Sequence, residues 1–255
     1  MTSLVHLDTN DRIATMVLDD PSRRNAMSTA LFDGIEASLA RLEADDRILV
    51  LRIRAEGPAF CAGFDLGAMA EDGMLPDFLA RLGGVCRRLR GLPAITVIEV
   101  QGPAIAGGCA LVSAGDLVHA GPDARFGYPV HPLGISPAVT LPTLMGGVGS
   151  GTARRMTMSG ELMDAESARN AGLVHVLAST RDELAQGVAK ECQRLASLDP
   201  TCLRETKRFL NELDRTDDDE RFTATLEASV GTGRSEDTGR RLAKALDSMR
   251  ARTER

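Results

Sequence analysis

The amino-acid sequence predicts an α/β fold. Runs rich in β-branched residues, typical of buried strands, occupy residues 12–18, 48–54 and 94–100. The segments between these runs carry apolar residues at the spacing of amphipathic helices. Two successive strands that are connected by a helix run parallel to each other, because the connection crosses over the sheet. This alternation therefore predicts a largely parallel sheet. The periodicity alone fits a Rossmann sheet and other α/β arrangements equally well.

Turn signals divide the first half of the chain. The strand at 12–18 ends at Asp19-Asp20-Pro21-Ser22, and Ser28 is placed to cap the next helix. That helix has one apolar stripe, formed by Leu31, Ile35, Leu39 and Leu42. After the strand at 48–54 a second helix is expected near 77–90, because Gly91-Leu92-Pro93 would end it.

Shorter strands and longer helices are expected in the second half. Strands are predicted at 117–120 and 173–177, with a glycine-interrupted helix at 144–158 between them. The helix predicted at 182–196 presents one apolar face, formed by Leu184, Val188, Cys192 and Leu195.

The last part of the chain is predicted to be wholly helical. The glycines of 231–233 interrupt it, and its final helix carries a stripe of Leu242, Leu246 and Met249. Dense charges of both signs predict a solvated face. We therefore expect a core over residues 1–198 and a C-terminal helical region over residues 199–255.

Length and charge exclude several classes of protein. A chain of 255 residues can bury a sizeable core in one large domain. A formal net charge of −6 argues against nonspecific nucleic-acid binding. No apolar run approaches the ~20 residues that span a membrane, and residues 1–8 lack the features of a signal peptide. We expect a cytoplasmic protein with neither nucleic-acid nor membrane partners.

The cysteines do not form a metal or disulfide pattern. They are scattered and contain no Cys-x-x-Cys pair: Cys61, Cys86, Cys109, Cys192 and Cys202. No metal site is therefore expected. Cys61 and Cys109 are candidate nucleophiles, but small residues in tight packing are the favoured interpretation.

Two glycine motifs follow predicted strands. They are Glu56-Gly57-Pro58-Ala59-Phe60-Cys61-Ala62-Gly63-Phe64-Asp65-Leu66 and Gln101-Gly102-Pro103-Ala104-Ile105-Ala106-Gly107-Gly108-Cys109-Ala110-Leu111. Glycine at such a junction lets the backbone approach a ligand with free N–H groups directed at it. Such groups suit a negatively charged oxygen. Close packing alone is the alternative reading of each motif taken singly.

In this order, about forty residues apart, the two motifs resemble those of the crotonase (enoyl-CoA hydratase/isomerase) superfamily. The match spans roughly residues 10–210 and continues in Arg24-Asn25-Ala26-Met27-Ser28, Ala114-Gly115-Asp116, Ala124-Arg125-Phe126-Gly127, Asp164-Ala165-Glu166 and Ala171-Gly172-Leu173-Val174. The resemblance implies a spiral of β-β-α repeats with a C-terminal helical region that packs subunits into trimers, often paired as hexamers. It also implies an acyl-CoA substrate, with coenzyme A as part of that substrate and no other cofactor.

The resemblance also implies an oxyanion hole. Chemistry at the carbon beside a thioester carbonyl builds charge on the carbonyl oxygen, which two backbone N–H donors can stabilise. By their positions in the family's two motifs, these donors correspond to the N–H groups of Ala62 and Gly107.

The same resemblance implies a binding segment for CoA. The turn from Ala62 through Gly63, Phe64 and Asp65 to Leu66 would hold the adenine and pantetheine, and Gly107 would contact the thioester. Arg23 and Arg24, with Ala26 in the following turn, would lie near the CoA phosphates. The arginine pair is read equally well as an exposed basic turn, and Asp65 as a residue that holds its own turn. A buried structural role is expected for Asp116.

The chain departs from the family where hydratases use two glutamates. The first position holds Ala110 and the second holds Val130, while Ala138 occupies the position of an alternative acid. Alanine and valine cannot transfer a proton. A positioned general acid or base typically raises the reaction rate by about 10²–10⁴-fold.

Other residues could replace the glutamates. Tyr128 and His131 flank the second position, and histidine titrates near neutrality. The alternative to a catalytic role is that Tyr128 is a packed core residue and His131 an ordinary loop residue. Glu71, Asp72 and Asp77 are further candidates, on a segment that could close over a substrate.

Two functions therefore remain open. The first is an acyl-CoA enzyme, a lyase or isomerase, that combines an oxyanion hole with isomerase, decarboxylase or thioesterase chemistry. The second is a non-catalytic acyl-CoA-binding protein. The run Gly147-Val148-Gly149-Ser150-Gly151 does not support a nucleotide loop, because no strand precedes it and it lacks the lysine. The acyl pocket is expected to involve Phe64, Met69, Phe78 and residues near Leu133.

Overall fold

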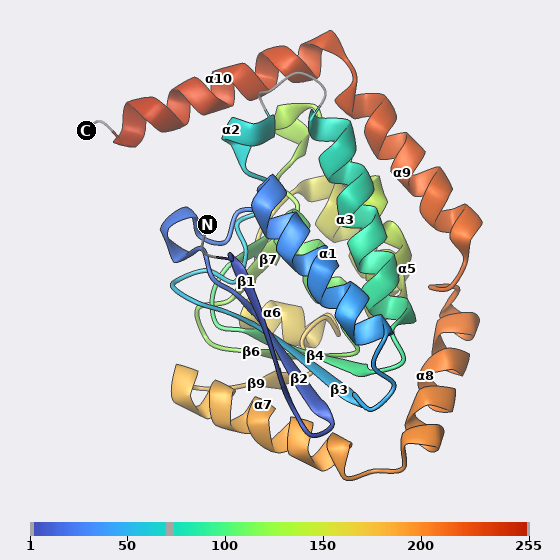
Figure 1. Cartoon of the computed structure of the whole chain (residues 1–255). Coiled ribbons are helices and arrows are strands. Elements are labelled where there is room, and N and C mark those ends of the chain that lie inside the picture. Colours follow the sequence, from blue (N-terminus) through green and yellow to red (C-terminus); the bar gives the residue numbers. More distant parts are fainter. Residues whose placement is uncertain (1–2, 70–73, 254–255) are drawn as a thin grey trace.

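The computed structural model describes residues 3–69 and 74–253, which form two sheets surrounded by helices (Figure 1). The six-stranded sheet has the order β1-β2-β3-β4-β6-β9, in which only β1 is antiparallel to its neighbour. Its strands are β1 (Val5–Asn10), β2 (Ile13–Leu18), β3 (Val50–Ala55), β4 (Ile95–Val100), β6 (Leu117–Ala120) and β9 (Val176–Leu177). The smaller sheet has the order β5-β7-β8, with β5 (Ala104–Ile105), β7 (Arg125–Gly127) and β8 (Met163–Asp164).

Helices cover both faces of the larger sheet (Figure 1). Helix α1 (Thr29–Glu43) packs beside α3 (Met74–Gly91) on one side, and α7 (Arg181–Ala196) covers the other. The α7 side chains predicted to form an apolar face are all buried: Leu184, Val188, Cys192 and Leu195. The Ser28 side chain accepts a hydrogen bond from Leu31 N and caps α1, as predicted.

Helices and strands whose apolar residues recur at a regular spacing were predicted correctly, and very short strands were not. The strands expected at 12–18, 48–54, 94–100 and 117–120 correspond to β2, β3, β4 and β6. The strand expected at 173–177 is confined to β9. The two- and three-residue strands β5, β7 and β8 are too short to give a period of two.

The β-β-α repeats implied by the resemblance are present. Strands β4 and β5 lead into α4 (Gly107–Ser113), and β6 and β7 lead through the 3₁₀ turns η2 (His131–Leu133) and η3 (Pro137–Thr140) into α5 (Leu141–Ser159). In α5 the backbone is kinked at Gly149, whose φ is +73°. The chain continues through α6 (Ala165–Asn170) and β9 into α7.

Three C-terminal helices follow the outside of the core (Figure 1). They are α8 (Pro200–Asp214), α9 (Asp219–Gly233) and α10 (Glu236–Thr253). Helix α9 packs on α3 and η3, and α10 packs on η2 and on the short helix α2 (Leu66–Met69). The break between α8 and α9 lies at Arg215, a left-handed residue that the sequence analysis did not identify.

A buried ion pair fixes α8 to the sheet. The Lys207 ammonium donates to Asp116 Oδ2 at 2.7 Å and to the Ala94 carbonyl at 2.8 Å. Asp116 Oδ2 also accepts from Thr96 N at 2.7 Å, and Lys207 is only 6% exposed. Burial lowers the pKa of Lys207, while Asp116 opposes that shift. Asp116 therefore has the structural role expected of it.

Candidate functional site

The fold brings the two glycine motifs into direct contact. Cys61 and Ala104 form an isolated parallel bridge, and Ile105 N donates to the Cys61 carbonyl at 2.9 Å. Gly108 lies so close to this segment that a Cβ on it would be 2.8 Å from the Cys61 Cβ. Glycine is therefore required for the start of α4 to reach the first motif.

The two predicted donors differ in whether their N–H groups are free. Ala62 N donates to the Arg24 carbonyl at 3.1 Å, so this N–H group is already used within the fold. Gly107 is the first residue of α4, where an N–H group has no partner inside the helix. Its nitrogen donates no hydrogen bond to any residue that the structure describes.

The second free donor is Phe64, which was expected in the CoA-binding turn and the acyl pocket but not as a donor. Met27 N donates to the Gly63 carbonyl at 2.8 Å, and Asp65 N donates to the Met27 carbonyl at 3.1 Å. In this parallel bridge the N–H of Phe64 itself points away from Met27, and no acceptor among the described residues binds it. Motif position alone could not separate Ala62 from Phe64, because the direction of each N–H depends on pairing with a distant segment.

The two motifs are held close at this point. A Cβ on Gly63, whose φ is +91°, would lie 3.8 Å from Gly107 N. A Cβ on Gly107 would lie 3.5 Å from the Phe64 ring. Ala106, immediately before Gly107, has a φ of +51°, a strained value for a non-glycine residue. Two free N–H groups, Phe64 and Gly107, thus belong to neighbouring turns.

A small apolar cavity of about 30 Å³ adjoins both donors. Among the described residues, its lining contains no carboxylate, imidazole or amine. It consists of Phe64, Leu79, Leu82, Ala106, Gly107, Tyr128, Val130, Ile135, Ser136, Pro137, Val139 and Thr140. Of the predicted pocket residues, Phe64 lines this cavity, as do Val130 and Ile135 near Leu133. Phe78 packs behind the cavity, with 5.6 Å between its ring centroid and that of Phe64. Met69 is buried and does not line the cavity.

The residues at the two glutamate positions lie on this site. Val130 is part of the cavity lining, and Ala110 is fully buried in the first turns of α4. Neither side chain can exchange a proton. The apolar side chain predicted at Val130 is therefore continued by neighbouring apolar residues of the wall, such as Leu79 and Ile135.

Among the described residues that line the cavity, Tyr128 is the titratable one. It is 1% exposed, and its hydroxyl lies against Cys109, Ser113 and Thr140. Burial, together with the neighbouring Cys109 thiol, raises the pKa of Tyr128 well above its ordinary value. The side chain is therefore a neutral phenol that can donate a hydrogen bond.

The other candidate proton donors lie elsewhere. His131 is exposed in η2 and does not line the cavity. Asp77 is exposed in the first turn of α3. Glu71 and Asp72 fall outside the described residues.

The segment expected to bind CoA forms an ordered turn. Asp65 Oδ1 accepts hydrogen bonds from Gly67 N at 2.9 Å and Ala68 N at 3.3 Å, and so it caps α2. Arg23 bonds to Asp65 Oδ2 at 3.3 Å and to Asp20 Oδ2 at 2.8 Å. Asp65 therefore holds its own turn, which was one of its two expected roles.

The remaining CoA candidates differ in accessibility. Arg24 and Ala62 are exposed, Ala26 and Leu66 are half-buried, and Gly63 is buried. An exposed Arg24 is compatible with either expected role, a phosphate contact or a basic turn.

The two motif cysteines are not nucleophiles in this structure. Both are fully buried, and burial raises the pKa of Cys61 and of Cys109 to about 12. Each thiol therefore remains protonated at neutral pH, as the packing interpretation requires.

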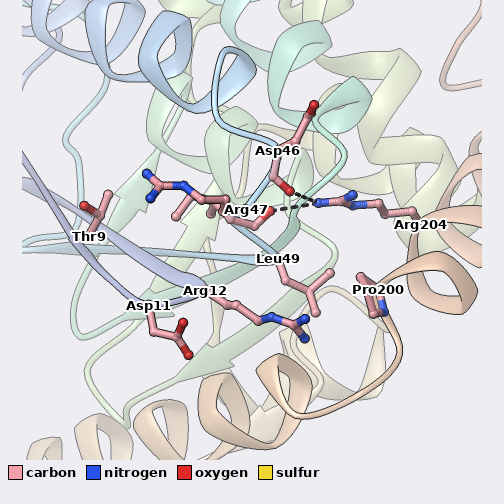
Figure 2. Close-up of a pocket in the computed structure, with 9 residues that line it drawn as sticks. Thr9, Asp11, Arg12, Asp46, Arg47, Leu49, Pro200 and Arg204 are labelled. Atoms are coloured by element: carbon pink, nitrogen blue, oxygen red, sulfur yellow. Dashed lines mark hydrogen bonds between the residues drawn. The ribbon is translucent and has the colours of Figure 1, made fainter.

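A larger cleft lies away from these groups. Its volume is about 430 Å³, and it is formed by the β1–β2 turn, the segment before β3 and the start of α8. Figure 2 shows Arg204 extending from α8 toward the segment before β3. There it donates to the carbonyls of Asp46 at 2.6 Å and Ile48 at 3.3 Å. The cleft thus contains a structural attachment for α8.

Within residues 3–69 and 74–253, no three His, Cys, Asp or Glu side chains are grouped so that they could hold a metal ion. Within the same residues, no helix combines the length and the apolar character that crossing a bilayer requires.

Comparison with known proteins gives a consistent result. The family model described as enoyl-CoA hydratase/isomerase matches residues 8–242. The 2,3-dehydroadipyl-CoA hydratase of Escherichia coli is 31% identical over 202 residues, which cover 79% of each chain. A solved enoyl-CoA hydratase/isomerase from Xanthobacter autotrophicus Py2 has a TM-score of 0.85 at 28% identity and 99% coverage of both chains. One from Mycobacterium paratuberculosis, at 22% identity, shares the fold with a TM-score of 0.84 over 96% of this chain and 99% of its own.

Proposed function

The chain belongs to the enoyl-CoA hydratase/isomerase family, and we propose that it acts on acyl-CoA thioesters by stabilising an enolate. The observation that carries this proposal is the pair of free N–H groups at Phe64 and Gly107 beside one cavity. Donors fixed by the backbone need no reorganisation when charge develops on the thioester oxygen. Loss of one such donor typically costs ~2.7–4 kcal/mol of transition-state stabilisation.

The reaction is one that proceeds without a glutamate base. Ala110 and Val130 replace the hydratase carboxylates, and the part of the cavity lining that the structure describes contains no carboxylate. Isomerisation, decarboxylation and thioester hydrolysis all profit from an oxyanion hole. Tyr128 is the better placed of the two candidate proton-transfer groups, because it lines the cavity and His131 does not.

A non-catalytic acyl-CoA binder is the alternative. The observation that favours it is the same apolar lining, since a binder needs the N–H groups and the CoA turn but no proton transfer. In that case Arg24, Ala26 and the segment 62–66 would keep their binding role. No cofactor other than the CoA of the substrate is proposed for either function.

Mass analysis of a mixed acyl-CoA panel distinguishes the two functions. The purified chain is incubated with enoyl, 3-enoyl, malonyl-type and saturated thioesters, beside a titration of CoA binding. Gain of water, a moved double bond, lost carbon dioxide or released CoA would each identify the reaction. Binding without any product would support the binder and contradict the enzyme.

We further propose that α8 contributes to a homotrimer or hexamer. Three large apolar side chains of this helix are exposed: Phe209 by 50%, Leu210 by 56% and Leu213 by 80%. Burying them in an assembly would remove this apolar surface from water. Light scattering of the purified chain and of the Leu213→Glu variant tests this; a wild-type monomer would contradict it.

A further inference from the structure

One wall of the apolar cavity is formed by a short segment, residues 134–140, that consists of a turn followed by η3. Its residues in the cavity lining are Ile135, Ser136, Pro137, Val139 and Thr140. Hydrogen bonds within a 3₁₀ turn have poorer geometry than those of an α-helix. The position of this wall therefore depends strongly on contacts outside the segment.

The Ser229 side chain of α9 joins the wall to the C-terminal helices. Its Oγ accepts a hydrogen bond from Val139 N at 2.8 Å and donates one to the Ser136 carbonyl at 2.9 Å, and Ser229 is fully buried. A serine inside a helix commonly donates to a carbonyl of its own helix. The buried Ser38 of α1 does so, with a bond of 2.8 Å to the Gly34 carbonyl. The hydroxyl of Ser229 is instead directed at the cavity wall.

Two threonines extend this attachment. Thr232 Oγ1 accepts from Ser136 N at 3.1 Å, and Thr238 Oγ1 of α10 donates to the Gly134 carbonyl at 3.1 Å. Gly134 has a φ of +78°, and a Cβ on it would lie 2.7 Å from Thr238 Oγ1. The backbone of the wall is thus bonded to both α9 and α10.

Close packing leaves little room for the cavity to extend past the wall. A Cβ on Gly83 of α3 would lie 3.1 Å from Val139 Cγ2. A Cβ on Gly233 of α9 would lie 3.1 Å from Leu75 and 3.5 Å from Leu79, both in α3. The cavity volume of about 30 Å³ corresponds to roughly two water-sized groups. A long acyl chain therefore has no room in this cavity unless the wall moves.

Loss of the Ser229 hydroxyl would release the wall. Val139 N and the Ser136 carbonyl would then lack their partner, and unsatisfied backbone groups destabilise the position that leaves them so. A displaced wall would let water bind both groups. Each methylene that enters the apolar space opened in this way would tighten binding by about fourfold.

We propose that Ser229 is a positioning residue that limits the length of the acyl chain, because it holds the wall of residues 134–140 in place. Thr232 and Thr238 support the same position. This inference rests on the function proposed above and concerns only which acyl chains fit. It assigns part of the substrate selection to the C-terminal helices, although the cavity lining that the structure describes contains no residue of these helices.

The test measures how the affinity of the full chain depends on the length of the alkyl group. The probes are the butyl, hexyl, octyl and decyl thioethers of CoA, which cannot be hydrolysed, with CoA alone as the reference, and binding is measured by calorimetry. Ser229→Ala removes the hydroxyl. Ser38→Ala is the matched control, because Ser38 is also buried in a helix but bonds within that helix.

We expect the affinity of the wild type and of Ser38→Ala to stop rising beyond the butyl probe. For Ser229→Ala we expect an increase of at least about tenfold from the butyl to the octyl probe, with unchanged affinity for CoA. Thr232→Val removes one bond to the wall at an exposed position and should show a smaller increase in the same direction. If Ser229→Ala does not fold, Thr232→Val decides the question.

Four results would overturn the inference. Equal affinities for the butyl and octyl probes in both wall variants would show that the hydroxyls do not limit chain length. An equal loss of affinity for every probe and for CoA in Ser229→Ala would make its role merely structural. A wild-type affinity that rises with chain length as steeply as that of Ser229→Ala would show that the wall is no limit. These three results leave the proposed function intact, whereas failure of the wild type to bind CoA or any probe would reject both.

Discussion

Gly108→Ala tests whether contact between the two glycine motifs sets the spacing of the N–H donors. The added Cβ would lie 2.8 Å from the Cys61 Cβ and 3.0 Å from the Cys61 carbonyl carbon, whereas ordinary contact begins at 3.4 Å. The start of α4 must therefore move away from the first motif by at least about 0.6 Å. Gly107 moves with α4 and Phe64 does not, so the two donors separate.

The expected loss follows from the geometry of such donors. Effective donors lie 2.7–3.1 Å from the oxyanion, and loss of one costs about 10²–10³ in kcat. We expect a loss of this order for Gly108→Ala, with about 1–3 kcal/mol lower stability from overpacking. Gly84→Ala is the matched control, because Gly84 is exposed in α3 and nothing lies within 4 Å of its Cβ position. That variant should keep full activity, and its free energy of unfolding should rise by about 0.5–1 kcal/mol.

Two assays follow the effect. Turnover is measured with the thioester that the panel identifies as substrate. Independently of turnover, infrared difference spectra of a bound saturated thioester, labelled at the carbonyl carbon, report polarisation of that carbonyl by the N–H groups. The carbonyl stretch should shift less in Gly108→Ala than in the wild type. A folded Gly108→Ala variant with wild-type turnover and the wild-type shift would refute the reasoning.

Three further predictions concern buried groups. Thiol alkylation of the native protein should modify Cys202, which is exposed, and spare Cys109, whose pKa burial raises to about 12; alkylation of folded Cys202→Ser at Cys109 would contradict this. Asp116→Asn should lower the free energy of unfolding by about 3–5 kcal/mol, because the buried Lys207 ammonium loses its partner. Urea denaturation measures that loss, and adding Lys207→Met should recover part of it. Burial lowers the pKa of His119 below 6.5, so the unfolded chain binds more protons and the free energy of unfolding should fall as the pH drops below 6.5. His119→Gln should flatten that pH dependence; an unchanged slope in urea titrations would argue against it.

The sequence by itself determined the fold class and most of the regular elements. Hydrophobic periodicity is local, so strands β2, β3, β4 and β6 and the apolar faces of α1 and α7 could be predicted from consecutive residues. The glycine motifs carried the family resemblance, and the absence of both hydratase glutamates needed no coordinates, since Ala110 and Val130 cannot ionise in any fold.

Only the tertiary structure decided which atoms are available for chemistry. Whether an N–H group is free depends on pairing between distant segments: Arg24 occupies Ala62 N, whereas the bridge with Met27 leaves Phe64 N open. The surroundings of the Tyr128 hydroxyl, which lies against Cys109, Ser113 and Thr140, likewise result from how α4 and η3 pack around it. Hydrogen-bond saturation is a property of the folded chain, and residue identity alone does not determine it.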